Sequence, residues 1–262
     1  MDIPGLEPAL YHSNILDYRR AIVVWRPRQA VVTDRLPVLY LLHGVTGDEW
    51  DWIAKGNAPQ TIQLLIDEGI LPPMMLVSVN DGLYKAGTGY LNWADGSGQF
   101  EDNFIEELIP HVDQTWATID NLKARWIGGL SMGGYGATHL GWNHPHLFGA
   151  IFALSSVLNA SFMEPQPKQV FKDQDDMNSH WPLKLASHLP AESKLPYYLS
   201  CGTDDGFIED NRKMARVLGE SHYPKFVYEE FPGGHSWDFW STHLNNAICY
   251  LVKITDFNFV SV

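Results

Sequence analysis

Short apolar runs without polar alternation recur along the chain, and a loop containing glycine or polar residues follows most of them. Runs that are apolar on both faces are typical of the buried strands of a parallel sheet. We expect strands at residues 9–14, 20–25, 38–42, 74–79, 125–130, 150–154, 196–200 and 226–231. The pattern therefore predicts one sheet of eight strands.

Between these runs, apolar residues return every three or four positions, which is the spacing of an amphipathic helix. Helices are expected over residues 61–68, 104–116 and 208–219, and in a last segment that carries Trp240, Leu244, Ile248 and Leu251. Pro110 falls inside the second helix and should kink or split it, because proline lacks an amide donor. Strands that alternate with helices predict a mostly parallel sheet covered on both faces, in a single α/β domain spanning residues 1–262.

Two stretches of the chain lack a clear period. Residues 83–100 are rich in glycine and aromatic side chains, and we interpret them as an excursion over the surface. Residues 156–190 form an insert of 35 residues that is polar and interrupted by prolines. Its large apolar side chains are Phe162, Met163, Phe171, Met177 and Trp181. Because these residues follow no period, they do not predict a core of their own.

Composition limits the kinds of binding partner and the cellular compartment that we expect for the protein. The formal net charge of −13 argues against nucleic acid or an anionic membrane surface as a partner. No window approaches the ~18 apolar residues of a membrane span. The N-terminus lacks the basic and apolar segments of a signal peptide, so we expect a cytoplasmic protein, and a secreted form with its leader removed stays open. Cys201 and Cys249 allow at most one disulfide and are interpreted as free thiols.

The most informative motif is Gly129-Leu130-Ser131-Met132-Gly133, which lies between an apolar run and a segment of small residues. In a G-x-S-x-G elbow, a sharp turn from strand to helix holds the serine in a strained conformation with its hydroxyl clear of the sheet. Glycine two residues away on either side lets the strand and the helix pass closely. The alternative is an ordinary glycine-rich turn that happens to contain a serine.

Aspartate and histidine follow later strands, at Asp204-Asp205 and at His235. A serine hydroxyl needs a base to become a nucleophile, and a carboxylate can orient a histidine for that task. The order serine, aspartate, histidine is that of α/β-hydrolases and differs from the orders in chymotrypsin and subtilisin. Because the carboxyl ends of parallel strands share one edge of the sheet, we expect these residues to meet there. The choice between the two aspartates stays open at this point.

Together these motifs resemble the putative-esterase, or esterase D-like, branch of the α/β-hydrolases. The matching stretches are residues 39–44, 106–110, 129–136, 201–205 and 234–237. Tributyrin and feruloyl esterases are the most similar members, because tyrosine follows Gly134 and tryptophan follows His235-Ser236. The branch also includes acetyl-xylan esterases, S-formylglutathione hydrolases and mycolyltransferases. The resemblance covers nearly the whole chain and implies the α/β-hydrolase fold.

By position, the resemblance implies that Ser131 is the nucleophile, His235 the base and Asp205 the acid of a catalytic triad. It also assigns an oxyanion hole to the backbone N–H groups of Val45 and Met132, which would meet the negative oxygen of a tetrahedral intermediate. Val45 stands where many lipases carry a second glycine, and this departure argues against bulky triglyceride substrates.

Tryptophan and histidine residues outside these motifs could also take part in binding. Loops that follow strands carry tryptophans suited to a substrate pocket, and we assign to it Trp50, Trp93 and Trp237. His139, His144 and His146 lack the spacing of a metal motif, so we interpret them as packing or surface residues. We therefore expect neither a metal nor a cofactor.

The sequence thus predicts a serine carboxylester hydrolase that acts through an acyl-enzyme on short-chain acyl, acetyl or feruloyl esters, either small molecules or linked to carbohydrate. Alternatives within the same chemistry are a thioesterase like S-formylglutathione hydrolase and an acyltransferase, and a non-catalytic binding module is the alternative of another class. The insert at residues 156–190 should leave the sheet beside Ser131 and form a lid over the active site; otherwise it is an exposed loop. The protein could form a homo-oligomer, but the sequence contains no feature that predicts one.

Overall fold

The computed structural model describes residues 3–31, 33–82, 87–163, 170–255 and 257, and its frame is one eight-stranded sheet. The strands are β1 (Leu6–Ser13), β2 (Tyr18–Trp25), β3 (Val38–Leu42), β4 (Met75–Val79), β5 (Arg125–Leu130), β6 (Ala150–Leu154), β7 (Tyr197–Gly202) and β8 (Phe226–Phe231). Their order across the sheet is β1-β2-β4-β3-β5-β6-β7-β8. β2 pairs antiparallel with β1 and β4, and the remaining neighbours are parallel. The predicted mostly parallel sheet is confirmed.

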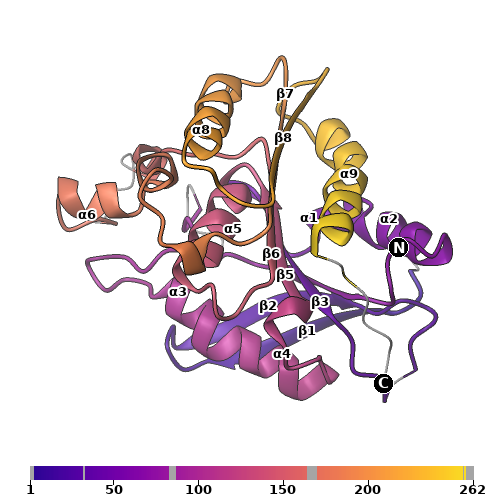
Figure 1. Ribbon diagram of the computed structural model, residues 1–262. Coiled ribbons are helices and arrows are strands. Elements are labelled where there is room, and N and C mark those ends of the chain that lie inside the picture. Colours follow the sequence, from indigo (N-terminus) through magenta and orange to yellow (C-terminus); the bar gives the residue numbers. More distant parts are fainter. Residues whose placement is uncertain (1–2, 32, 83–86, 164–169, 256, 258–262) are drawn as a thin grey trace.

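Helices cover both faces of this sheet (Figure 1). One face packs against α4 (Ile109–Trp116), α5 (Met132–Asn143) and α8 (Ile208–Glu220). The other packs against α1 (Asp51–Ala54), α2 (Ala58–Asp67) and α9 (Trp237–Thr255). Shorter helical segments are α3 (Phe100–Asp102), η1 (Asn103–Leu108), η2 (Leu122–Ala124), η3 (Ala160–Met163), α6 (Gln174–Ser179), α7 (Pro182–Leu185) and η4 (Ala191–Ser193).

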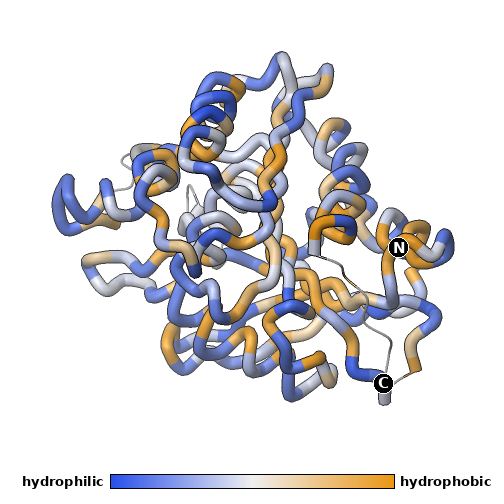
Figure 2. Tube along the Cα trace, in the orientation of Figure 1, coloured by the Kyte–Doolittle hydropathy of each residue, from blue (hydrophilic) through white to orange (hydrophobic). Residues whose placement is uncertain are grey.

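The central strand β3 shows why the strands lack polar positions. Alternate residues of a strand point to opposite faces, and both faces of β3 are covered. Val38, Tyr40 and Leu42 join the core under α4, α5 and α8. Leu39 and Leu41 join the core under α2 and α9. Figure 2 shows the same distribution along the chain, with apolar residues along the strands and on parts of the helices.

The helix predicted over residues 104–116 is divided, as Pro110 led us to expect, but the division precedes the proline. The first part is the π-helix η1, and α4 starts at Ile109 with Pro110 in its first turn. The backbone stays helical from η1 into α4, and the wider π turn directly before Pro110 is where the helix adapts to a residue that lacks an N–H. α2 likewise starts earlier than predicted, at Ala58, with Pro59 in its first turn.

The prediction that residues 83–100 run over the surface is wrong for the part that the structure describes. Leu91, Trp93 and Phe100 are at most 6% exposed. They form a buried cluster with Tyr135 of α5 and with side chains at the start and middle of the insert, namely Val157, Ala160, Met163, Val170 and Met177. The two segments without a period therefore bury each other. Residues 83–86 and 164–169 lie outside the described residues.

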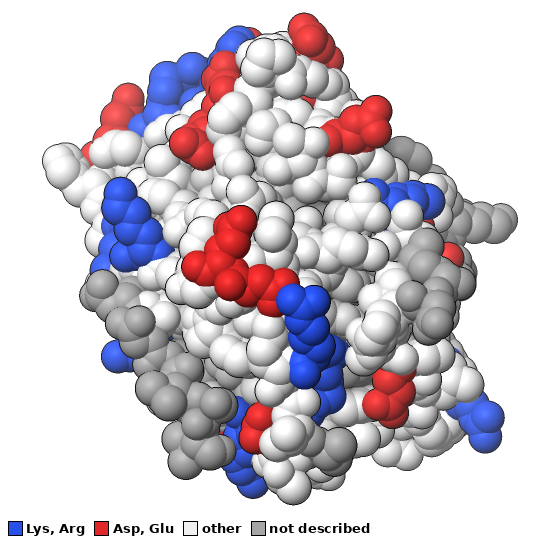
Figure 3. All heavy atoms as spheres, turned by 90° about the vertical axis from the view of Figure 1, so that its right-hand side faces the viewer, with Lys and Arg blue, Asp and Glu red and all other residues white. Residues whose placement is uncertain are grey.

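The charged side chains do not gather into one acidic face on the side of the molecule where α2 and α9 lie. Figure 3 shows this side, on which acidic and basic groups are scattered over a mostly uncharged surface. Within the described part of the chain, no helix has the length and apolar character needed to cross a membrane.

The centre of the sheet is where the chain changes direction. From β3 it continues to β4 on one side, whereas β5 pairs with β3 on the other and leads on to β6. A reversal of this kind opens a crevice at the carboxyl ends of the two strands, where α/β proteins bind ligands. Gly44 follows β3 and Ser131 follows β5, so both loops leave the sheet at this point of reversal.

Candidate active site

Ser131 stands on a strained turn between β5 and α5. Its φ of 53° and ψ of −120° form a conformation that residues with a side chain rarely adopt. Its N–H donates to the Leu154 carbonyl at 2.9 Å, and its own carbonyl accepts from the Val157 N–H at 3.2 Å. The backbone of the serine is thus fixed by the segment at and after the end of β6. The strained elbow predicted from the motif is confirmed.

Neither outer glycine of the motif has room for a Cβ. A Cβ on Gly129 would lie 2.5 Å from the carbonyl carbon of Gly133, and one on Gly133 would lie 2.2 Å from the carbonyl oxygen of Leu42. Both contacts are with backbone atoms, which cannot rotate away as a side chain can. The close approach of β3, β5 and α5 therefore requires glycine at both positions.

Gly133→Ala is expected to destabilise the fold by about 1–3 kcal/mol, because the backbone must shift to accept the methyl group. Gly219 in α8 is the matched control, since nothing lies within 4 Å of a Cβ placed there. Gly219→Ala should raise the free energy of unfolding by up to about 1 kcal/mol, because alanine is the better helix former. Urea unfolding measures both changes, and a Gly133→Ala protein as stable as the parent would contradict the close packing.

The structure brings Ser131, His235 and Asp205 into one hydrogen-bonded line. The Ser131 Oγ lies 2.9 Å from His235 Nε2, and His235 Nδ1 lies 2.9 Å from Asp205 Oδ2. Asp205 is 3% exposed, whereas Asp204 is exposed and contacts the Gly233 carbonyl through its backbone N–H. The geometry therefore favours Asp205 over Asp204 as the partner of the histidine.

Both carboxylate oxygens of Asp205 accept hydrogen bonds. Oδ2 accepts from His235, and Oδ1 accepts from the Phe207 N–H at 2.9 Å. Burial by itself would raise the pKa of Asp205, but these hydrogen bonds, above all the one from His235, hold that pKa below its usual range. The carboxylate is ionised at neutral pH, so it can keep the proton of His235 on Nδ1 and leave Nε2 to accept from Ser131.

Two aromatic rings flank the His235 imidazole. The ring centroids of Phe207 and Trp240 lie 5.1 and 4.8 Å from it, at interplanar angles of 66° and 88°. Neither residue was predicted from the sequence to belong to the site. Trp240 fits the apolar face of α9, and Phe207 precedes α8 without belonging to any motif. The sequence offers one signal that they belong to the site: Phe207 comes shortly after Asp205, and Trp240 comes shortly after His235.

The loop after β3 passes directly beside the nucleophile. A Cβ on Gly44 would lie 3.3 Å from the Ser131 Cβ. The loop is supported by His43, whose side chain is 1% exposed. The Asp81 N–H donates to His43 Nε2 at 3.1 Å, so Nδ1 carries the proton and donates to the Gly44 carbonyl at 2.7 Å. The Tyr90 hydroxyl donates to the His43 carbonyl at 3.1 Å, and neither Asp81 nor Tyr90 was assigned this task from the sequence.

The two predicted oxyanion donors lie on the segments that flank the serine. Met132 is the first residue of α5, and the N–H groups of a first turn have no acceptor within the helix. The helix dipole adds a positive potential at that end. Val45 directly follows Gly44 and is 41% exposed. Met132 thus directly follows the serine, and the loop that carries Val45 passes beside the serine at Gly44.

The three tryptophans predicted to line the pocket have different surroundings. Trp50 is 38% exposed at the start of α1, and Trp237 is half-buried against Trp240 at a centroid distance of 5.3 Å. Trp93 is 1% exposed, and its indole N–H donates to the Thr88 carbonyl at 3.0 Å. Trp93 thus belongs to the buried cluster with the insert and offers no surface to a ligand, whereas Trp50 and Trp237 do.

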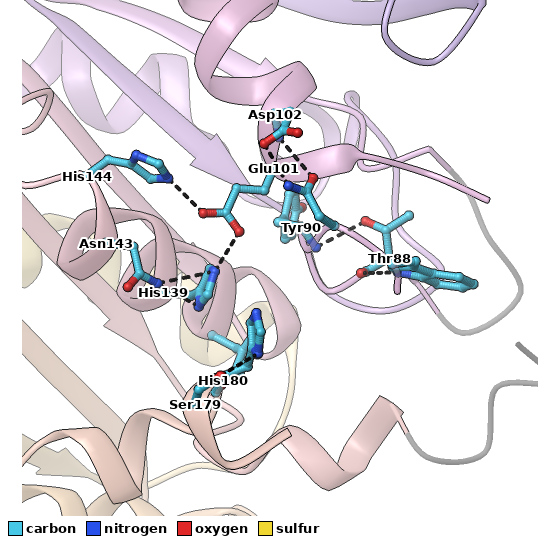
Figure 4. A network of polar contacts seen from close by, with 12 residues as sticks. Thr88, Tyr90, Glu101, Asp102, His139, Asn143, His144, Ser179 and His180 are labelled. Atoms are coloured by element: carbon cyan, nitrogen blue, oxygen red, sulfur yellow. Dashed lines mark hydrogen bonds and ion pairs between the residues drawn. The ribbon is translucent and has the colours of Figure 1, made fainter. Parts of the chain in front are cut away.

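His139 and His144 share the carboxylate of Glu101 (Figure 4). Glu101 Oε2 lies 2.8 Å from His139 Nε2, and Oε1 lies 2.7 Å from His144 Nε2. The ring of His146 packs beside that of His144, at a centroid distance of 6.1 Å. Glu101 lies in α3 and His139 lies in α5, so the contact between their side chains joins these two helices. Among the described residues, no group of three or more His, Cys, Asp or Glu side chains is arranged to hold a metal ion.

Glu101→Gln is expected to lower the free energy of unfolding by about 1–3 kcal/mol at pH 7, since hydrogen bonds to a charged group are lost. Burial alone would raise the pKa of Glu101, but His139 and His144 hold it well below its usual range. A lowered carboxylate pKa stabilises the fold above the unfolded value of 4.5, and the stabilisation fades as the pH falls below that value. The effect of the substitution should therefore shrink between about pH 4.5 and pH 3.5, and urea titrations that show equal losses at pH 7 and pH 3.5 would contradict it.

Comparisons with known proteins extend over nearly the whole chain. A family model described as a putative esterase matches residues 13–251, which include Ser131, Asp205 and His235. An acetyl esterase of Caldicellulosiruptor saccharolyticus is 29% identical over 248 residues, covering 86% of this chain and 87% of that protein. An endo-1,4-beta-xylanase/feruloyl esterase of Xylanibacter ruminicola is 34% identical over 120 residues, or 44% of this chain and 16% of that protein. The solved structure of a ferulic acid esterase superposes with a TM-score of 0.84 at 24% identity, covering 95% of this chain and 98% of the other, and it confirms the predicted fold.

Proposed function

Because the chain belongs to the putative esterase family and is a carboxylic ester hydrolase, we propose that it cleaves esters through a Ser131–His235–Asp205 triad. The observation that carries this proposal is the continuous line of hydrogen bonds from the serine hydroxyl to the buried carboxylate, 2.9 Å at each step. Cys201 is unsuited as an alternative nucleophile, since burial raises the pKa of its thiol to about 12 and keeps it protonated at neutral pH.

In the proposed acylation step, the Ser131 oxygen attacks the carbonyl carbon of the ester while its proton passes to His235 Nε2. Asp205 stabilises the imidazolium, and the N–H groups of Val45 and Met132 donate to the oxyanion. The intermediate then collapses, the bond to the alcohol oxygen breaks, and His235 gives its proton to that oxygen. Water attacks the remaining acyl-serine with His235 again as base, which releases the carboxylic acid and restores the serine.

As substrates we propose short-chain acyl esters, with acetyl esters first and feruloyl esters second, either free or linked to carbohydrate. The acetyl esterase of Caldicellulosiruptor saccharolyticus supports the first choice, because the likeness covers most of both chains. The endo-1,4-beta-xylanase/feruloyl esterase of Xylanibacter ruminicola supports the second choice, over 44% of this chain and 16% of that protein. Reaction with water requires no cofactor and no metal.

Two surfaces are proposed to select among these esters. Trp50 and Trp237 retain exposure next to the loops that carry the catalytic groups, and their rings suit an acyl or an alcohol group. The insert at residues 156–190 begins beside the nucleophile, where Val157 contacts the Ser131 backbone. We propose that its described part forms one wall of the site and limits the size of the bound ester.

A panel of esters tests the proposed function. The p-nitrophenyl esters from acetate to octanoate, methyl ferulate and S-formylglutathione are compared by kcat/KM. We expect the highest value for acetate, a decline with chain length and measurable cleavage of methyl ferulate. A clear preference for S-formylglutathione would move the assignment to a thioesterase. Absence of turnover with every ester, together with no labelling by a phosphonate, would leave a non-catalytic binding module.

A further inference from the structure

The side chain of Asn211 is fully buried in α8, where it contacts two segments of the active site. Its amide nitrogen donates to the carbonyl oxygens of Ser156 and Phe207, at 2.9 Å in each case. Both hydrogens of the amide are thereby used. The two acceptors come from different parts of the fold, because Ser156 begins the insert after β6 and Phe207 lies in the loop after β7.

The first acceptor leads to the nucleophile. The carbonyl of Ser156 and the N–H of Val157 are the two ends of one peptide group, which is planar and rigid. The Val157 N–H donates to the Ser131 carbonyl at 3.2 Å, while the Ser156 carbonyl accepts from Asn211. Asn211 is therefore connected to the backbone of Ser131 through a single rigid unit.

The second acceptor leads to the acid and the base. The Phe207 N–H donates to Asp205 Oδ1 at 2.9 Å, and the Phe207 ring packs against His235. The Phe207 carbonyl accepts from the side chain of Asn211 and also from its backbone N–H, at 3.1 Å. A fixed Phe207 therefore restrains one oxygen of the carboxylate and one side of the imidazole.

We propose that Asn211 is a positioning residue that sets the placement of Ser131 relative to the His235–Asp205 pair. The inference rests on the proposed function, because it concerns the geometry of that triad. Asn211 acts through Ser156 and Phe207 and does not touch the reacting atoms. One short side chain bridges the segment that holds the nucleophile and the loop that holds the acid, so a shift of either one is resisted by the other.

Packing alone does not account for an amide at this position. Asn211 Oδ1 is buried and has no hydrogen-bond partner among the residues that the structure describes. An unsatisfied buried oxygen is unfavourable, and leucine has the same branched arrangement of heavy atoms without one. What asparagine supplies and leucine lacks is the pair of donors, and these are the groups that join the two segments.

Asn211→Leu and Asn211→Ser test the proposal, with Asn103→Leu as the matched control. Asn103 is also buried, at 2% exposure, and its amide donates to Ser13 and Glu107, which are not triad residues. Asn211→Leu should lower kcat for p-nitrophenyl acetate about 10- to 100-fold with KM within about twofold, as misplacement of reacting groups does. Asn211→Ser keeps one donor and should fall between the parent and the leucine variant. Asn103→Leu should lower the melting temperature and leave kcat unchanged.

Phosphonate labelling of Ser131 counts the folded sites in each variant, so that kcat refers to folded protein. The positioning role is overturned if Asn211→Leu keeps the parent kcat, or loses no more of it than Asn103→Leu does. If the leucine variant does not fold, an unchanged kcat in Asn211→Ser overturns it equally. A crystal structure of either variant gives a readout that does not depend on activity. A Ser131 Oγ to His235 Nε2 distance that stays at 2.9 Å would refute positioning, whereas an inactive parent protein would refute the proposed function alone.

Discussion

Ser131→Ala is expected to lower kcat for p-nitrophenyl acetate by about 10⁴-fold or more, because no acyl-enzyme can form without the serine oxygen. The residual rate would come from substrate binding and from the proposed oxyanion hole, whose backbone donors the substitution does not remove. The fold should be retained, since the backbone of residue 131 is held by hydrogen bonds to Leu154 and Val157 that do not involve the side chain.

Two measurements make this result specific to Ser131. A phosphonate with a p-nitrophenol leaving group should add one equivalent to the parent protein, on a peptide containing Ser131, and none to the variant. Ser78→Ala removes another buried serine hydroxyl, in β4, and should leave kcat unchanged. Full turnover by Ser131→Ala, with no activity in a mock preparation purified in the same way, would require a different nucleophile.

The bounds of the fully buried strands at the centre of the sheet were predictable from their apolar runs. The predicted bounds of residues 38–42 agree with those of β3, in which all five residues are buried. The first strand was predicted to start at residue 9, whereas β1 starts at Leu6. β1 is an edge strand, and its first residues are exposed or only partly buried, so the apolar signal there is weak.

The mutual burial of residues 87–100 and the insert was not predictable from periodicity. A period appears when one element repeatedly faces the same surface, and these irregular segments meet each other through isolated side chains such as Trp93 and Met163. The same limit applies within the site. Phe207, Trp240 and Asn211 acquire their contacts with the triad and its supporting loops only when β6, β7 and α9 come together.

The candidate catalytic residues were easier to predict, because local chemistry marks them. Ser131 lies in a motif whose glycines are required by close backbone contacts, and His235 lies in a glycine-containing loop after the last strand. The acid was harder to choose, since Asp204 and Asp205 are adjacent and chemically identical. What separates them is burial and the direction of the side chain, both of which depend on the tertiary structure.

Asp205→Asn is expected to lower kcat by about 10⁴-fold, whereas Asp204→Asn should have a small effect. The structure explains the expected difference. Asp205 accepts a hydrogen bond at each oxygen, from His235 Nδ1 and from the Phe207 N–H. An asparagine has only one acceptor oxygen, so its NH₂ group must face one of these two donors.

If the asparagine oxygen stays with Phe207, the NH₂ group donates to His235 Nδ1 and moves the histidine proton to Nε2, where it blocks acceptance of the Ser131 proton. If the amide turns over, the Phe207 N–H loses its acceptor and the loop that carries residue 205 is displaced. Either outcome removes the base from its working state. Asp204→Asn deletes the same charge at an exposed side chain and is therefore the matched control. Values of kcat for p-nitrophenyl acetate rank the two variants, and the reverse ranking would transfer the role of the acid to Asp204.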